Sequence, residues 1–179
     1  MSKYTLEDDA KTGLKRIVAD EEFTIIRLKR TVKKGERGGL VEGPDNLSQG
    51  GTSWIFDDSK AIESSSVRED ALLIGGSVAK GKCILSKKAT LCDESVATDG
   101  SKLRGHAIVC DKSTIGGLAI VTGKSVVIRS SVGGNSTVEE KSVVRNVTLA
   151  GKDSVKDNVE HSEWLETYKC VVSGIKATT

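Results

Sequence analysis

Residues 71–82 read Ala71-Leu72-Leu73-Ile74-Gly75-Gly76-Ser77-Val78-Ala79-Lys80-Gly81-Lys82, and this doubled six-residue pattern decides the fold. In each half, a small residue is followed two positions later by Leu or Ala, and two positions after that by Gly. Alternate residues of a β-strand point to the same side, so the small and the aliphatic residue share one face of a short strand. The pattern therefore predicts a short strand and a turn in every hexad.

The pattern repeats from Ile55 to about Val155, in 17 hexads. Its aliphatic position recurs at a constant step of six up to Val127, moves by five to Val132, and then recurs at a step of six again. Alanine occupies it in every third hexad of the early repeats, which favours a coil with three sides: Ala61, Ala79 and Ala97. Hexapeptide repeats of this kind form a parallel β-helix, here of five to six coils. The alternative is a β-sandwich in which the hexad is a coincidence. A pattern that recurs 17 times with only one shortened step argues against that alternative.

The corners of the coil carry their own signal. Gly, Asp and Asn tolerate the backbone angles of tight turns, which other residues avoid. One of these three follows the aliphatic position by two places in many repeats: Asp57, Gly75, Gly81, Asp93, Asp99, Gly105, Asp111, Gly117, Gly123, Gly134 and Asn146. We therefore expect the chain to turn at these positions.

The composition agrees with a narrow core. Hydrophobic residues make up 37% and aromatic residues 3% of the 179 residues, with 19 Gly and one Pro. A column of Val, Leu, Ile, Ala and Ser needs few large side chains. The net charge of +2 is too small to indicate nucleic acid or a membrane surface as the partner. The sequence has no apolar run long enough to cross a membrane and no basic-apolar leader, so we expect a soluble cytoplasmic protein.

We divide the chain into an N-terminal β-hairpin or cap module at 1–53, the β-helix at 54–155, and a C-terminal cap or tail at 156–179. Residues 14–19 and 23–32 are expected to form two strands of one hairpin, and Trp54 is expected to cover the first coil. Residues 161–172 contain one of the two Trp and one of the two Tyr. They are interpreted as a lid over the last coil, with a partner-binding tail as the alternative.

The N-terminal segment resembles a specific family. Its distinctive residues are Gly38-Gly39-x-Val41-Glu42 and Asn46-Leu47-Ser48-Gln49, followed by Trp54-Ile55-x-Asp57. They are similar to the opening of bacterial and phage hexapeptide-repeat proteins, within the hexapeptide transferase-like superfamily. The resemblance covers most of the chain up to Asp57 and continues through the hexads. It implies a left-handed β-helix and a phage or prophage context, and it provides no catalytic residues to transfer.

Acyltransferases of that superfamily often use a His as general base, so an acyl-CoA-dependent enzyme with His106 in an intersubunit cleft is one hypothesis. His106 lies just after a corner, with no carboxylate in its own repeat. Lys88 and Lys124 occupy the same position one coil away in each direction, and they are expected to lower the pKa of His106. The three-His zinc site of the superfamily's carbonic anhydrases needs more than the two His present, so we predict no metal and no cofactor.

Two cysteines are expected to lie one above the other, because three hexads, or one full coil, separate Cys92 from Cys110. Their α-carbons would then be near disulfide distance. In a reducing cytoplasm we interpret them as two free thiols, with a disulfide as the alternative. Cys83 occupies the small inward position and is interpreted as core filler.

One side of the coil is expected to be apolar on its outer face, whereas the other two sides carry Lys and Arg. If exposed, this face is large enough to mark an interaction surface. Its residues are the predicted interface: Leu72, Ile74, Thr90, Cys92, Ile108, Cys110, Val126 and Ile128. The alternative is that a terminal segment folds back over it.

A second candidate surface is a group of basic residues that could bind an anion or a partner: Arg27, Lys29, Arg30, Lys33, Lys34 and Arg37. A solvated strand and loop is the alternative, because acidic residues balance the basic ones nearby. We predict a non-catalytic scaffold that forms a homo-oligomer, as a dimer or trimer, and binds a protein partner such as a host factor. Nucleic acid and membranes are not expected partners.

Overall fold

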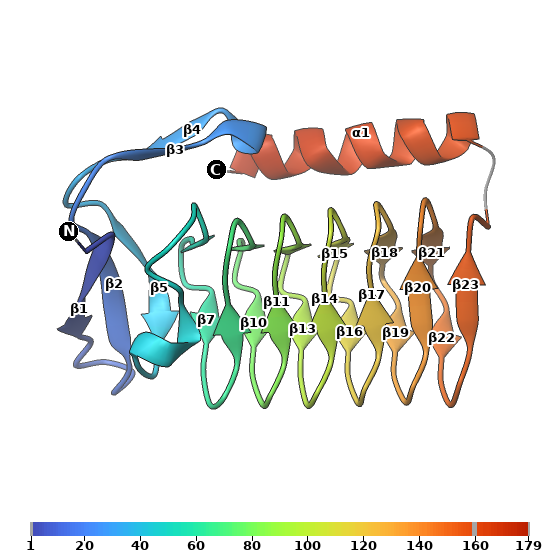
Figure 1. Cartoon of the computed structure of the whole chain (residues 1–179), viewed down its shortest axis with the longest axis horizontal. Coiled ribbons are helices and arrows are strands. Elements are labelled where there is room, and N and C mark those ends of the chain that lie inside the picture. The colour runs from blue at the N-terminus through green and yellow to red at the C-terminus, as the bar shows by residue number, and fades with distance from the viewer. Residues whose placement is uncertain (1, 159–160, 179) are drawn as a thin grey trace.

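The computed structural model describes residues 2–158 and 161–178 and shows a parallel β-solenoid with an α-helix lying along it (Figure 1). Three walls of strands run the length of the solenoid, and two of them have six strands each, in agreement with the predicted coil number. The predicted β-helix is therefore confirmed. The chain enters at an antiparallel β cap and leaves the solenoid through α1 (His161–Thr178).

Each wall is named here after one strand of an early coil. The β7 wall contains β7 (Lys60–Ala61), β10 (Val78–Ala79), β13 (Val96–Ala97), β16 (Thr114–Ile115), β19 (Ser131–Val132) and β22 (Thr148–Leu149). The β8 wall contains β8 (Ser66–Val67), β11 (Ile84–Leu85), β14 (Lys102–Leu103), β17 (Ile120–Val121), β20 (Thr137–Glu139) and β23 (Ser154–Lys156). The β9 wall contains β6 (Trp54–Ile55), β9 (Leu72–Leu73), β12 (Thr90–Leu91), β15 (Ile108–Cys110), β18 (Val126–Ile128) and β21 (Val143–Arg145).

The hexad explains how the coils stack. Ala79 pairs with Ala61 and Ala97 on the β7 wall, so the alanines predicted to stack do so. Val109 pairs with Val127, three full hexads later, whereas Val127 pairs with Val144, one position short of three hexads, because of the single shortened step. Every corner residue named from the sequence has a positive φ, from 53° at Asp57 to 73° at Gly123. The inward aliphatic and small residues are buried throughout most of the stack and form one continuous core.

The N-terminal cap has a different strand order from the predicted one. β2 (Lys15–Ala19) pairs antiparallel with β1 (Tyr4–Asp8) and β5 (Arg37–Val41), and β5 continues into the β7 wall. The expected hairpin of residues 14–19 with 23–32 is therefore wrong. Instead, β3 (Phe23–Ile25) pairs with β4 (Arg30–Val32) around the short helix η1 (Ile26–Leu28), and this pair forms a separate terminal hairpin.

The Gly-Gly pair of the N-terminal motif lies where β5 crosses the first coil. A Cβ atom on Gly38 would lie 2.6 Å from the carbonyl oxygen of Ile55, and one on Gly39 would lie 2.3 Å from Cγ2 of Ile55. Only Gly allows this approach of the two backbones. Trp54 is fully buried at this junction, with its ring edge-on to Tyr4 and Phe23, as expected of a residue that covers the first coil.

In the Asn-Leu-Ser-Gln segment, side-chain amides form hydrogen bonds to backbone groups in the way that a neighbouring strand would. The segment begins at Asn46, the last residue of the short helix η2 (Pro44–Asn46). The amide of buried Asn46 donates to the carbonyl oxygens of Glu63 (2.8 Å) and Ser65 (2.9 Å). Gln49 Nε2 donates to the carbonyl oxygen of Tyr4 at 3.0 Å, and its Oε1 accepts from the backbone N–H of Lys3 at 2.9 Å. These amides satisfy backbone groups at the start of the solenoid that no strand pairs with.

The C-terminal segment does not form the expected lid over the last coil. It forms α1, which runs back along the solenoid axis over the β9 wall toward the terminal hairpin (Figure 1). An 18-residue helix is about 27 Å long, and six strands at about 4.8 Å spacing span about 24 Å, so the helix matches the length of the wall. In the described part of the chain, no helix has the length and hydropathy needed to cross a bilayer.

Candidate interaction surfaces

The apolar face predicted as an interface is buried within the chain itself. Its eight residues lie on the outer side of the β9 wall, and the most exposed of them, Ile128, is only 5% exposed. The expected exposure of this patch is therefore wrong, and the alternative of a terminal segment folded over it describes the structure. Two segments share this role, because the terminal hairpin lies over the first coils and α1 over the later ones (Figure 1).

Trp164 is the main contact of α1 with the solenoid. Its side chain is 4% exposed, and its Nε1 donates to the carbonyl oxygen of Lys124 at 2.9 Å. Its ring stacks between those of His161 and Tyr168, with centroids 5.6 and 5.3 Å away. The Nζ atoms of Lys124 and Lys141 lie 5.8 and 5.7 Å from the ring centroid, which adds a cation–π attraction. Aliphatic residues farther along α1 pack on the wall and continue this contact: Leu165, Val171 and Val172.

Arg27 fixes the terminal hairpin to the same wall. Its guanidinium donates to Thr90 Oγ1 and to the carbonyl oxygen of Asp70, both at 2.7 Å, and to the carbonyl of Lys88. Burial lowers the pKa of Arg27 to about 10, and Tyr168 of α1 is close enough to act on it electrostatically. Thr90 is the one polar residue in the predicted apolar face, and Arg27 is its partner. The terminal hairpin and α1 therefore meet over the wall.

The six basic residues do not form one patch. Arg27 points inward, Arg30 Nη2 pairs with Glu36 at 2.8 Å, and Arg37 Nη2 pairs with Glu7 at 3.0 Å. The remaining three are exposed: Lys29, Lys33 and Lys34. The interpretation as a solvated strand and loop fits this arrangement better than an anion site does. Arg27 is therefore bound to the β9 wall, and Arg30 and Arg37 are ion-paired within the cap, so the predicted basic surface is reduced to the three lysines and two paired arginines.

His106 lies at the corner column between the β8 and β9 walls, with Lys88 below it and Lys124 above it. Partial burial lowers the pKa of His106 first, and the charges of Lys88, Lys124 and Arg27 lower it further, as expected from the sequence. No hydrogen bond or ion pair to a carboxylate is found for His106 among the described residues. The imidazole is thus favoured in its neutral form, but nothing in the described part of the chain orients it as a general base.

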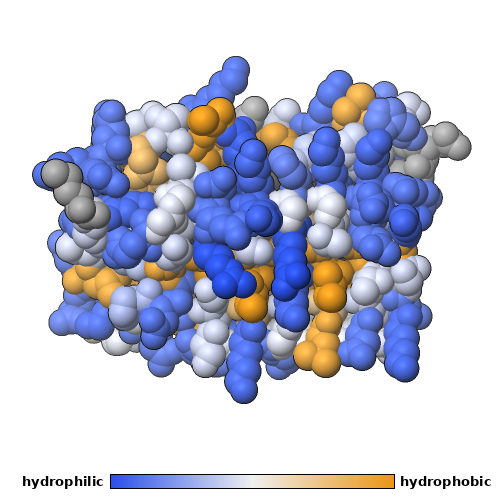
Figure 2. Space-filling view, viewed as in Figure 1, coloured by the Kyte–Doolittle hydropathy of each residue, from blue (hydrophilic) through white to orange (hydrophobic). Residues whose placement is uncertain are grey.

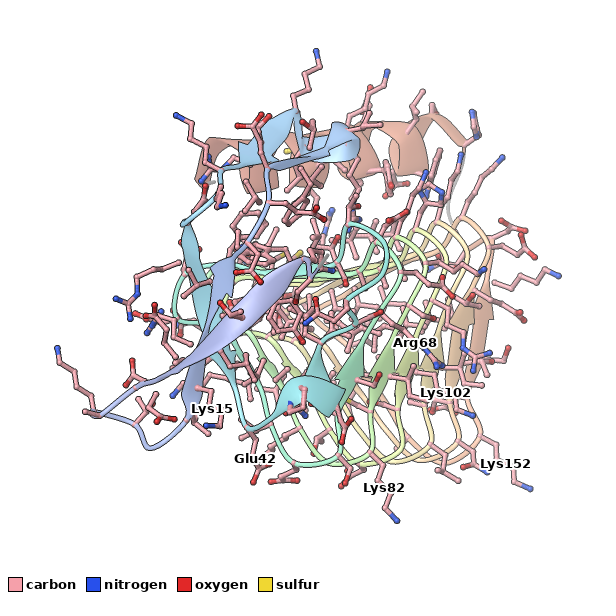
Figure 3. The ribbon with its side chains drawn as sticks, turned by 60° about the vertical axis from the view of Figure 1, so that its left-hand side comes forward. Lys15, Glu42, Arg68, Lys82, Lys102 and Lys152 are labelled. Carbon is pink, nitrogen blue, oxygen red and sulfur yellow. The ribbon has the colours of Figure 1, made fainter. Side chains whose placement is uncertain are left out.

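The other two walls are solvated. Arg68 and Lys102 extend outward from the β8 wall, and Lys82 and Lys152 extend from the corner that lies opposite the β9 wall (Figure 3). The face seen in Figure 2 is mostly hydrophilic, with small separate groups of hydrophobic side chains. Large hydrophobic side chains that are exposed in the described residues are scattered over different elements: Ile26, Leu118 and Val147.

The far end of the solenoid is a surface that the sequence did not indicate. β22 and β23 are the last strands of their walls, and no strand of the described chain pairs with their outer edges. Inward-facing Leu149 and Val155 are only partly buried there. The outer edge of β21 is closed differently, because the Asn158 side chain accepts from the Val143 N–H at 2.8 Å and donates to the Val143 carbonyl oxygen at 2.7 Å. Two of the three walls therefore end in open strands.

The two stacked cysteines have a third neighbour. All four cysteines are free, and the Sγ atoms of Cys92 and Cys110 and a carboxylate oxygen of Asp93 lie within 4.8 Å of one another. Both thiols are buried on the outer side of the β9 wall, and Arg27 of the terminal hairpin is close enough to Cys92 to interact with it electrostatically. The stacking of Cys92 on Cys110 was expected, whereas Asp93 was identified from the sequence only as a corner residue.

Comparison of the chain with protein-family models and with curated proteins finds no match. The architecture itself defines the class of protein as a β-helix repeat protein. Neither comparison supports the resemblance to bacterial and phage hexapeptide-repeat proteins, which rests on the N-terminal residues and the hexads.

Proposed function

We propose that this protein is a non-catalytic scaffold that forms a two-fold dimer through the last coil of its solenoid and binds a macromolecular partner on its outer surface. The open edge of β23 is the observation that supports the dimer. An unpaired strand edge is a template for pairing with another chain, and natural proteins usually cover it. Here α1 covers a wall and leaves the end of the stack open.

The backbone groups available at this edge follow from the earlier coils. On the β8 wall, the first residue of each strand donates its N–H to the next coil: Ser66 to the Cys83 carbonyl, Ile84 to the Ser101 carbonyl, and Ile120 to the Ser136 carbonyl, each within 3.0 Å. Ser154 occupies this position in the last coil. Its N–H therefore points along the axis, beyond the last coil of the described residues.

A second copy fits this edge in one arrangement. A two-fold axis through Val155 makes β23 antiparallel to its symmetry mate and places Ser154 opposite Lys156 of the other copy. In an antiparallel pair, facing residues at every second position form two hydrogen bonds, because the N–H of each donates to the C=O of the other. Val155 then meets Val155 near the axis, and the Lys156 side chains are kept apart. The partly buried Leu149 and Val155 become covered in the same contact.

The antiparallel cap at the N-terminal end limits this association to a dimer. β1, β2 and β5 form antiparallel pairs across the first coil, so a head-to-tail stack cannot continue there. A contact made by the same surface of both copies closes on itself. We thus expect a dimer rather than a fibre.

The partner is proposed to be a protein in the cytoplasm of a bacterium or of a phage-infected cell, with inhibition or sequestration of a host factor as the effect. The resemblance of the N-terminal segment to phage hexapeptide-repeat proteins supports this part of the proposal. The solvated β7 and β8 walls stay accessible in the dimer, since neither is covered by α1.

The dimer is tested by light scattering on the wild-type protein and on Ser154→Pro. The wild type is expected at twice the chain mass of 19.0 kDa. Pro removes the outward N–H of Ser154 and leaves the internal bonds of the coil, so Ser154→Pro is expected at 19.0 kDa with an unchanged far-UV circular dichroism spectrum.

Ile84→Pro is the matched control, because Ile84 has the same position in an inner coil. The Ile84 N–H donates to the Ser101 carbonyl oxygen at 3.0 Å. Ile84→Pro removes this internal hydrogen bond, so it is expected to lower the Tm, whereas Ser154→Pro is expected to change the mass in solution and keep the fold. A wild-type mass of one chain at all concentrations, or a Ser154→Pro variant with the wild-type mass, would show that β23 is not the contact.

A further inference from the structure

We propose that Cys92, Cys110 and Asp93 form a binding site for a thiophilic divalent cation of the zinc type on the covered outer side of the β9 wall. The three side chains come from two adjacent coils. Cys92 and Asp93 directly follow β12, and Cys110 ends β15, which pairs with β12 in parallel register. The stacking of the coils therefore places the two thiols and the carboxylate around one point.

The geometry suits a tetrahedral ion. All three ligand atoms lie within 4.8 Å of one another, and Zn–S and Zn–O bonds of about 2.3 and 2.1 Å place neighbouring ligands at somewhat shorter separations. Cys92 is 0% and Cys110 3% exposed, so the soft ligands are shielded from water. Asp93 is half-buried at the corner, with its carboxylate at the edge of the covered region.

The neighbouring Cys110 thiol and burial raise the pKa of Cys92 well above its usual range, so this thiol is protonated when no cation is bound. Burial raises the pKa of Asp93, as do the charges of Asp111 and Glu94. Binding of a divalent cation releases the thiol protons to bulk water as the thiols become thiolates. The remaining sulfur contacts, to the carbonyl oxygens of Val109 and Val127, are long at 3.6 and 3.7 Å.

The position of the pair argues against simple core filling. Cys83 fills the inward position of the β8 wall, where the coils below and above have buried Ser65 and Ser101. Cys92 and Cys110 instead lie on the outer side of the β9 wall, in a column whose neighbouring positions are both Ile: Ile74 and Ile128. Two thiols beside a carboxylate replace aliphatic packing at the centre of this column.

A groove at the corner provides access and a fourth ligand. It is lined by Asp93 and Asp111, together with Glu94, Lys112 and Arg129. The acidic residues favour entry of a cation, and water in the groove can complete a four-coordinate ion. Lys112 pairs with Glu94 at 3.5 Å and Arg129 with Asp111 at 3.3 Å, which leaves Asp93 as the acidic residue of the groove with no ion pair among the described residues.

Cobalt titration of the reduced full chain tests this site, because thiolate ligands give Co²⁺ a near-ultraviolet charge-transfer band and tetrahedral geometry gives intense visible bands. We expect one Co²⁺ per chain, displaced by Zn²⁺. Cys92→Ser and Cys110→Ser are expected to lose the charge-transfer band or reduce it by half. Asp93→Asn is expected to lower the affinity at least about tenfold while retaining the fold, since Asn tolerates the φ of 53° at this corner.

Cys83→Ser and Cys170→Ser are the matched controls, one inward and buried and the other exposed on α1. Both are expected to keep the cobalt spectrum. The proposal is overturned if the folded wild type gives no cobalt band, or if Cys92→Ser and Asp93→Asn bind like the wild type. It is also overturned if protein purified without reductant contains a Cys92–Cys110 disulfide that the metal does not prevent.

Discussion

The β8 and β9 walls are built from the same hexad but have opposite surroundings. Their inward residues are alike, with Val67, Leu85 and Leu103 on one wall and Leu73 and Leu91 on the other, all fully buried. Their outward residues differ, because the β8 wall carries Lys and Arg and the β9 wall carries aliphatic residues and thiols. The inward residues thus build the coil, and the outward residues decide whether a wall meets water or another segment of the chain.

This difference has an energetic consequence. Outward residues of a solvated wall can change at little cost, whereas those of a covered wall belong to a second core between the wall and α1. The burial of Ile74, Ile108 and Ile128 at 5% exposure or less shows that this second core is as dry as the column inside the coils. Substitutions at equivalent positions of the two walls therefore separate the two roles.

The largest effect is expected for Ile108→Lys on the β9 wall. The ammonium group would lie beneath the covering segments without a partner, which costs about 3–5 kcal/mol of the free energy of unfolding. Ile120→Lys is the matched change on the β8 wall, where Ile120 is half-exposed and pairs with Lys102, and we expect a loss below about 1 kcal/mol there. Urea unfolding of the two variants measures the difference. Equal losses would mean that α1 does not cover the wall in solution.

Trp164→Ala is expected to cost about 3 kcal/mol, because it removes the largest buried side chain of α1 and its hydrogen bond to Lys124. The substitution is expected to weaken the packing of α1 on the wall, so amide hydrogen exchange should become faster in α1 than in the wild type, with little change in the coils. Leu118→Ala, at an exposed corner, serves as the control and should leave both the Tm and the exchange pattern unchanged. Uniform loss of protection along the solenoid would contradict a separate second core.

Arg27→Met is expected to cost about 2 kcal/mol, since it leaves Thr90 and two carbonyl oxygens beneath the terminal hairpin without their donor. The effect should be local to the hairpin and the adjoining coils, and differential scanning calorimetry with hydrogen exchange measures it. Arg68→Met on the solvated β8 wall is the control, with an expected change within about 0.5 kcal/mol. A similar loss in both variants would remove the special role of Arg27.

The smallest effect is a pH dependence that originates at the start of the β9 wall. Lys3 is buried, its Nζ donates to the Ser53 carbonyl oxygen at 3.0 Å, and burial lowers its pKa from 10.5 to about 8. Between these two pKa values, the unfolded chain binds more protons than the folded chain does. The free energy of unfolding therefore rises with pH in that range. Between pH 7 and 9 we expect Lys3 to contribute an increase of about 1 kcal/mol.

Denaturant unfolding of the wild type and of Lys3→Met at both pH values isolates this contribution. The variant is expected to lack the increase of the wild type, whatever its absolute stability. The same pH dependence in both proteins would assign it to another group.

Much of the solenoid could be predicted because its rules are local. The corner residues, the stacking of Ala61 with Ala79 and the shift of register at Val132 all follow from counting along the chain. The cap could not be predicted as well, because the pairing of β2 with β5 instead of β3 is decided by contacts across the first coil. The lowered pKa of His106 could be expected from its neighbours at fixed spacing, whereas the inward turn of Arg27 could not.

The sequence by itself determined the coil, its three sides, its corners and the stacked thiols, since a hexad repeats the same short-range steric and hydrophobic choices in every turn. Only the tertiary structure decided which segment covers the apolar wall, that Asp93 joins Cys92 and Cys110, and that the far end of the stack stays open. The cover of the wall depends on how α1 and the terminal hairpin return over the solenoid, whereas the position of Asp93 depends on the exact stacking of adjacent coils. The spacing of residues along the chain contains no information about that return.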